Sequence, residues 1–204
     1  MKIKKVNLKK LSKNRKPKFK VVMFYGPVAV GKYTVANEFA KQTKYNFFHN
    51  HSVYDLVRGL FERDSFSLAY LYETIFFALF KEIAKAKMNV VVTHAYSSGY
   101  ISKTGLSDLE YMKKTESIIE SAGGIIYFVH LTAEPNVLLK RVTGNSRKKF
   151  RKLKDPKIMK KVLKEKRWEN YLTDSAPVRN NIEINNSNLT PKQVVKKLIE
   201  EIGI

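Results

Sequence analysis

Cysteine is absent from this chain of 204 residues. The absence excludes a disulfide framework, thiol catalysis and zinc sites built on thiolates, and it is typical of a protein of the reducing cytosol. The length suits one α/β domain with a full hydrophobic core, because a second domain would have too few residues left. We therefore expect a single cytoplasmic globular unit, either a monomer or a dimer.

Long apolar runs are missing as well. The richest apolar segment, residues 66–86, is interrupted by Glu73, Lys81 and Glu82, so the sequence offers no stretch suited to crossing a bilayer. A basic segment followed by the apolar run Val21–Val30 superficially resembles a secretory signal. That run is better explained as the strand and turn of a nucleotide-binding motif, so neither secretion nor a membrane partner is expected.

Acidic residues are few, and 18 Asp and Glu against 39 Lys and Arg give a net charge of +21. The excess is local: residues 1–20 carry ten basic residues and no acid, and residues 140–167 carry fourteen against two acids, so the remainder is nearly neutral. We predict a basic arm over residues 1–18 and a folded domain over residues 19–204. The arm is either a solubilising tail or a weak, non-specific nucleic-acid contact.

The segment Phe19–Ala40 contains the pattern around which the domain is organised. An apolar run, Val21–Tyr25, leads through a turn into apolar residues at helical spacing. The turn has the form G-x-x-x-x-G-K, in which backbone N–H groups and a lysine surround a polyphosphate at a helix N-terminus. It predicts an ATP site formed by Gly26, Pro27, Val28, Ala29, Val30, Gly31, Lys32, Tyr33 and Thr34.

The residue after the lysine departs from the common form of this motif. Tyr33 stands where Ser or Thr usually reaches Mg²⁺, and Thr34 follows it. The resulting GKYT is similar to the GKGT of adenylate and cytidylate kinases. We therefore expect no direct Mg²⁺ ligand from Tyr33, and Thr34 is the candidate ligand in the loop.

Strand and helix patterns alternate from this loop to the end of the chain. Further strands are predicted at 46–49, 89–93, 125–131 and 181–185, with helical patterns between them. The pattern predicts an α/β three-layer sandwich, in which a five-stranded parallel sheet is covered by helices on both faces. Two helices are predicted to pack through apolar residues: 53–61 through Val53, Leu56, Val57, Leu60 and Phe61, and the buried helix 66–86 through Tyr72, Phe76 and Phe80.

Polar side chains follow the second and third strands, at the edge where parallel sheets bind ligands. His49 and His51 follow one strand, and His94 follows the next, where many kinases place an aspartate. The alternatives are that the histidines are hydrogen-bonded strand ends and that Arg58 only pairs with a neighbouring acid. The residues predicted to bind a phosphate acceptor are His51, Asp55, Arg58 and His94.

A basic segment follows the helix that ends near Arg141. Residues 143–155 combine a glycine with several lysines and arginines, which is typical of a flexible lid that closes over transferring phosphates. Arg141, Arg147 and Arg151 are predicted to stabilise the charge that develops on the phosphoryl group.

Four segments together resemble the P-loop nucleoside and nucleotide kinase-like superfamily: GPVAVGKYT, the histidine-rich end of the second strand, RVTGNSRKKFRK and INNSNLTPKQVV. The resemblance is nearest to its uncharacterised members, often labelled AAA-family ATPases or shikimate-kinase-like. It implies a P-loop NTPase fold with strand order 2-3-1-4-5 and a lid, and ATP and Mg²⁺ as cofactors. Shikimate kinase itself lacks support, because its acidic pair and triple-glycine turn are missing. Adenylate kinase lacks support because its aspartate after the third strand and its long lid are missing.

The leading hypothesis is an ATP-dependent kinase of a small molecule or nucleotide. Lys32 would contact the β- and γ-phosphates, and His51 or Asp55 would accept the proton of the acceptor. The alternative is a nucleic-acid-associated ATPase or polynucleotide kinase that uses the basic arm. A nucleotide-binding scaffold without catalysis is the third hypothesis.

Overall fold

The computed structural model describes residues 16–144, 153–164 and 174–204. Within them one sheet has the strand order β2-β3-β1-β4-β5, and every neighbouring pair is parallel. The predicted fold class and strand order are therefore confirmed. The elements are β1 (Lys20–Tyr25), α1 (Lys32–Thr43), β2 (Asn46–Phe48), α2 (Asn50–Arg58), α3 (Phe66–Lys85), β3 (Val90–Thr93), α4 (Asp108–Ser121), β4 (Ile125–Thr132), α5 (Pro135–Arg141), α6 (Pro156–Lys164), β5 (Asn181–Asn185) and α7 (Pro191–Ile202).

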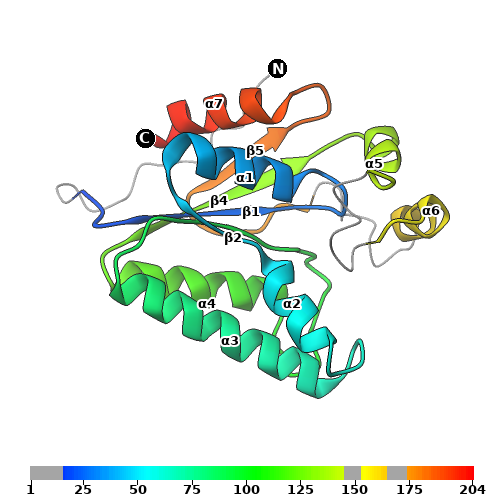
Figure 1. The fold of residues 1–204 in the computed structure, drawn as a ribbon, viewed down its shortest axis with the longest axis horizontal. Helices are drawn as coiled ribbons and strands as arrows, with labels where there is room; N and C mark the ends of the chain where they lie inside the picture. Colours follow the sequence, from blue (N-terminus) through cyan, green and yellow to red (C-terminus); the bar gives the residue numbers. More distant parts are fainter. Residues whose placement is uncertain (1–15, 145–152, 165–173) are drawn as a thin grey trace.

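Helices cover both faces of the sheet (Figure 1). α1 and α7 lie on one face, and α3 and α4 lie on the other. α2, α5 and α6 gather toward the end of the sheet at which β1 finishes. Parallel sheets bind ligands at this carboxyl end, so the arrangement places three helices around the expected site.

The central strand β1 is buried on both faces, as its uninterrupted apolar sequence predicts. Val21, Met23 and Tyr25 pack toward α3 and α4, and Val22 and Phe24 pack toward α1 and α7. The alternation follows from the period of two in a strand. The strand that carries the phosphate-binding loop is thus fixed by two separate cores.

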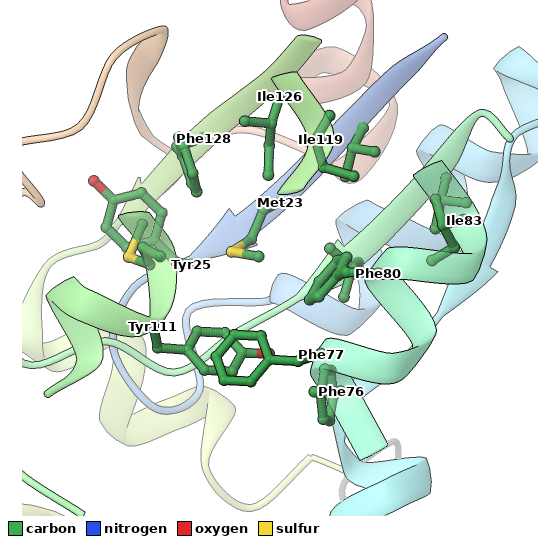
Figure 2. Close-up of a cluster of buried hydrophobic side chains, with 14 of the residues drawn as sticks. Met23, Tyr25, Phe76, Phe77, Phe80, Ile83, Tyr111, Ile119, Ile126 and Phe128 are labelled. Atoms are coloured by element: carbon green, nitrogen blue, oxygen red, sulfur yellow. The ribbon is translucent and has the colours of Figure 1, made fainter. Parts of the chain in front are cut away.

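One of these cores is shown in Figure 2. Side chains of β1 and β4 face side chains of α3 and α4, and each of them is buried. Burying one large apolar side chain contributes about 1.5–3 kcal/mol, so the cluster is a principal source of stability on this face. The cluster includes Met23, Tyr25, Ile126, Phe128, Phe77, Phe80, Tyr111 and Ile119.

The starts of two helices are fixed by capping boxes. The Ser107 hydroxyl accepts a hydrogen bond from the backbone N–H of Glu110, whose carboxylate accepts one from the Ser107 backbone N–H. Thr190 and Gln193 make the same reciprocal pair at the start of α7, with Pro191 in the first turn. Both pairs satisfy N–H groups that a helix start would otherwise leave without partners.

The prediction for the helix after β2 was wrong in its boundaries and its apolar face. The helix begins at Asn50 and ends at Arg58, where Gly59 follows, so Leu60 lies in the turn beyond it and is 81% exposed. Val53 and Val57, four residues apart, are buried, whereas Leu56 is 67% exposed. Two apolar residues on one face are enough to dock this short helix.

The long helix α3 is less completely buried than its composition predicts. Phe76 and Phe80 are in the core, but Phe66 and Tyr70 at its start are exposed and Tyr72 is half-buried. The start of α3 extends beyond the sheet, so the helix has a packing partner on one side only there.

Across the described ranges, no helix combines the length and apolarity that crossing a bilayer demands.

Candidate active site

The phosphate-binding loop, residues 26–34, connects β1 to α1. Gly26 has a φ of 129°, and a Cβ atom there would overlap the carbonyl oxygen of Leu131. Gly31, with a φ of 107°, precedes α1 as its N-cap residue. The loop therefore needs glycine at both ends. It leads into the N-terminus of α1, where backbone N–H groups favour an anion.

Lys32 lies at the start of α1 and reaches back across the loop. Its Nζ atom donates hydrogen bonds to the carbonyl oxygens of Gly26 at 2.6 Å and Pro27 at 2.9 Å. The charge is thus held over the loop, where a polyphosphate would bind. The predicted contact of Lys32 with phosphate stays a prediction.

Tyr33 and Thr34 point in different directions. The Tyr33 ring packs against Phe47 and His49, with ring centroids 5.4 and 4.8 Å apart. Thr34 is exposed and lines the cavity described below. The tyrosine therefore joins the loop to the end of β2, and a metal contact of Thr34 stays a prediction.

The second half of the loop is held by α5 and by the residue after β5. The Arg141 guanidinium donates to the carbonyl oxygen of Val30 at 3.2 Å and to the side-chain and backbone oxygens of Asn186 at 2.9 and 3.0 Å. Asn186 Nδ2 donates to the same Val30 oxygen at 2.8 Å. Arg141 is therefore a support of the loop as well as a residue of the cavity wall.

A cavity of about 1380 Å³ opens over the carboxyl end of the sheet. Ligand pockets commonly hold about 300–1,000 Å³, so this cavity has room for two substrates side by side. The nucleotide side is lined by residues 28–34 with Arg141, Leu153, Ile158, Asn186, Leu189 and Pro191. The other side is lined by His49, His51, Tyr54, Arg58, Tyr72, Glu73, His94, Tyr96, Tyr100, Asp108 and Tyr111.

Thr93 explains why β3 ends without an aspartate. Its hydroxyl donates to Asn50 Oδ1 at 2.9 Å and accepts from the Asn50 backbone N–H at 3.3 Å. His49 Nδ1 lies 2.7 Å from the same hydroxyl, and since the single hydroxyl proton goes to Asn50, the histidine must be the donor. The end of β3 is therefore used to tie β2 and the start of α2 together.

The predicted acceptor residues on α2 are brought near one another. His51 Nδ1 lies 3.3 Å from Asp55 Oδ1, and the Arg58 guanidinium donates to the carbonyl oxygen of Phe61 at 2.8 Å. His51 and Arg58 line the cavity, whereas Asp55 faces His51 from outside the lining. The Arg58 guanidinium thus has a backbone carbonyl among its partners, and its role in binding an acceptor stays a prediction.

His94 and Asp108 form a buried pair on the acceptor side. His94 Nε2 lies 3.7 Å from Asp108 Oδ1, and the two side chains are only 7% and 14% exposed. Burial lowers the pKa of His94 to about 3, with a further contribution from the charge of Lys32, so its imidazole is neutral. Burial also raises the pKa of Asp108 to about 7, against a hydrogen bond donated by the Ser97 backbone N–H at 2.9 Å.

Asp108 is the site residue that sequence reasoning missed. An acid in the first turn of a helix is commonly explained by the helix dipole, an explanation that gives Asp108 no role in a site. The signal against that explanation is that Ser107 and Glu110 already form the complete cap.

The predicted lid residues Arg147 and Arg151 lie outside the described residues, as does most of the predicted lid, so their roles stay predictions.

The strand order, the loop between β1 and α1 and the cavity above them define a P-loop NTPase fold of the kinase-like type. The chain has a TM-score of 0.64 to a proposed kinase of Chloroflexus aurantiacus, at 12% identity over 92% of this chain and 97% of the other.

Two other solved structures share this fold. Shikimate kinase of Bacteroides thetaiotaomicron gives a TM-score of 0.59 at 17% identity, covering 91% and 99% of the two chains. A gluconokinase of Sinorhizobium meliloti gives 0.55 at 16% identity, covering 93% and 98%. No family model matches the sequence, and no curated protein matches it. The likeness therefore lies in the fold, over nearly the whole length of these kinases.

Proposed function

We propose that this protein is an ATP-dependent phosphotransferase that acts on a small molecule. The observation that carries the proposal is the single cavity that joins the phosphate-binding loop to a second, tyrosine-rich half. A kinase must hold nucleotide and acceptor next to each other, with the transferring group between them. The solved kinases that share the fold support this class of reaction.

Each part of the nucleotide side has a role in this proposal. The loop N–H groups and Lys32 would bind the β- and γ-phosphates, and Arg141, with the lid residues Arg147 and Arg151, would neutralise charge on the transferring group. Leu153, Ile158, Leu189 and Pro191 supply apolar surface suited to a nucleobase.

The side chains around the cavity indicate how Mg²⁺ would be held. Within the described residues, no cluster of three or more histidines and acids is arranged to hold a metal ion. Mg²⁺ carried in with ATP would not need such a cluster, because this ion keeps several waters and binds chiefly through substrate phosphates. When bound it would neutralise phosphate charge, and Thr34 is the residue of the loop that would contact it or its waters.

Lys32→Ala tests the proposal. ATP consumption is measured with nucleosides, nucleotides, sugars, cyclitols and short oligonucleotides as acceptors. The variant should lose at least about 10²-fold in kcat, since one charge contact to the transferring group is commonly worth that much. Lys41→Ala, on the exposed last turn of the same helix, is the matched control and should keep full turnover.

Three results are informative. Turnover by Lys32→Ala equal to that of the wild-type protein would refute the kinase proposal. Oligonucleotides as the preferred acceptors would favour the polynucleotide kinase instead. ATP binding without turnover in any mixture would favour the scaffold.

A further inference from the structure

The acceptor side of the cavity holds a carboxylate to which the proposed function has given no role. This inference rests on that function. Three acids of the described residues line the cavity: Asp64, Glu73 and Asp108. Asp64 is mostly exposed at the rim, and Glu73 accepts a hydrogen bond from the Thr104 hydroxyl at 2.7 Å. Asp108 differs from both, because it is buried beside the end of β3.

The two oxygens of Asp108 have different surroundings. Oδ2 accepts the hydrogen bond from the Ser97 backbone N–H, which fixes the orientation of the carboxyl group. Oδ1 is turned toward His94 Nε2, at a separation beyond hydrogen-bond reach. Among the described residues, His94 Nε2 is a buried nitrogen without a hydrogen-bond partner. Asp108 and His94 therefore meet at one point of the cavity wall, where Oδ1 faces a neutral imidazole.

That point is linked to the phosphate-binding loop. The backbone N–H of His94 donates to the carbonyl oxygen of Phe24 at 2.9 Å, one residue before the end of β1. The charge of Lys32 is near enough to contribute to the lowered pKa of the His94 imidazole. His94 thus contacts β1 beside the phosphate-binding loop through its backbone and faces Asp108 through its side chain, so an acceptor held at Asp108 would lie close to the loop.

We propose that Asp108 is the general base of the transfer and that the acceptor is an alcohol. The acceptor hydroxyl would donate a hydrogen bond to Asp108 Oδ1, beside the neutral imidazole of His94. Its oxygen forms a bond to the γ-phosphorus of ATP while the bond from that phosphorus to the β,γ-bridging oxygen breaks. ADP leaves with the electron pair, and the hydroxyl proton passes to Asp108 and then to water.

The charges around Asp108 favour an alcohol over a phosphate as the acceptor. An alcohol carries a proton that must be removed, whereas a phosphate monoester is already ionised at neutral pH and needs no base. Asp174, which accepts from the Ser98 backbone N–H, adds a second negative charge near Asp108. A phosphate placed there would meet two carboxylates, so a nucleoside monophosphate is disfavoured.

The histidine and the tyrosines that surround Asp108 do not compete with it as bases near neutral pH. His94 from β3 is neutral, and burial raises the pKa values of the surrounding tyrosines, so they stay protonated. Burial and Asp174 set the pKa of Asp108 near the operating pH, which suits a general base. The tyrosines concerned are Tyr72, Tyr96, Tyr100 and Tyr111.

Asp108→Asn is the decisive variant, because it keeps the shape and the Ser97 hydrogen bond but cannot accept a proton. Transfer is measured with two kinds of probe: phosphate-free alcohols (nucleosides, sugars and cyclitols) and nucleoside monophosphates. ATP hydrolysis, in which water is the acceptor, is measured as well. The kcat should fall about 10²- to 10⁴-fold with an unchanged KM for ATP. Glu82→Gln, an exposed residue of α3 outside the cavity lining, is the control and should retain full activity.

A pH profile separates the chemical role from a structural one. Wild-type kcat should rise with pH through an apparent pKa near 7 and then level off, and this limb should vanish in Asp108→Asn. Asp174→Asn removes a like charge, so it should move the limb to lower pH.

The failures of the two proposals are distinguishable. Retention of wild-type kcat by Asp108→Asn, or a preference of the wild-type protein for nucleoside monophosphates, overturns the role of Asp108 while the Lys32 dependence of turnover leaves the kinase intact. Absence of any turnover, including hydrolysis, overturns the kinase proposal itself and this inference with it.

Discussion

The burial of Asp108 has a measurable consequence for stability. Its pKa rises from 3.8 to about 7 in the folded chain, so the folded state binds the proton more tightly than the unfolded state. Stability linked to this group is therefore complete at low pH and is lost as the pH rises from about 4 through 7. At 1.36 kcal/mol per pH unit, the loss amounts to about 4 kcal/mol.

Asp108→Asn should remove this loss, because an amide stays neutral at every pH. The free energy of unfolding is measured in urea at pH 4, 6 and 8 for both proteins. The two should be nearly equal at pH 4, and the variant should be the more stable one at pH 8 by up to about 4 kcal/mol, or roughly 10 °C in Tm. Asp64→Asn, whose carboxyl is mostly exposed, should show no such divergence. Parallel stability curves for wild type and Asp108→Asn between pH 4 and 8 would refute the reasoning.

Two further predictions concern the supports of the phosphate-binding loop. Gly26→Ala should destabilise the fold by more than about 2 kcal/mol in urea unfolding, because its Cβ would overlap the Leu131 carbonyl oxygen. Gly105→Ala also has a positive φ but meets no atom within 4 Å, so a loss equal to that of Gly26→Ala would contradict the steric argument. Arg141→Ala should weaken the stabilisation of the protein by ATP in thermal melts, because Asn186 and the loop lose their shared donor. Arg141→Lys should rescue it only in part, since one ammonium cannot reproduce a forked contact, and full rescue would count against this account.

The sequence was sufficient for the architecture and for the position of the phosphate-binding loop within it. Uninterrupted apolar strands indicate a parallel sheet, and Gly26, Gly31 and Lys32 occur at the junction of a strand and a helix, where their spacing has a physical meaning. Both signals are local in the chain. The strand order came from the resemblance to a superfamily, which local periodicity alone does not supply.

The acceptor half could not be predicted in the same way. Asp108 meets His94 only because α4 and the end of β3 are brought together by packing on the sheet, which no local pattern in the sequence records. Tyr72 belongs to an apolar helix, but its position near the start of α3 places it at the cavity instead of deep in the core. Leu56 is apolar and yet exposed because it lies on α2 off the face of Val53 and Val57, and Leu60 is exposed because it follows Gly59, where α2 has ended.

The phosphate-binding loop is encoded early in the chain but is held by residues that come much later. The Leu131 carbonyl packs against Gly26, and Asn186 and Arg141 hold the Val30 oxygen. On a ribosome that adds about 5–20 residues per second, Asn186 follows Gly26 by roughly 10 to 30 s. A nascent chain that ends before Asn186 therefore has the whole motif without the full set of contacts that shape it. Nucleotide binding should be among the last properties that the growing chain acquires, and ATP should protect arrested chains from proteolysis only after Asn186 has left the ribosome.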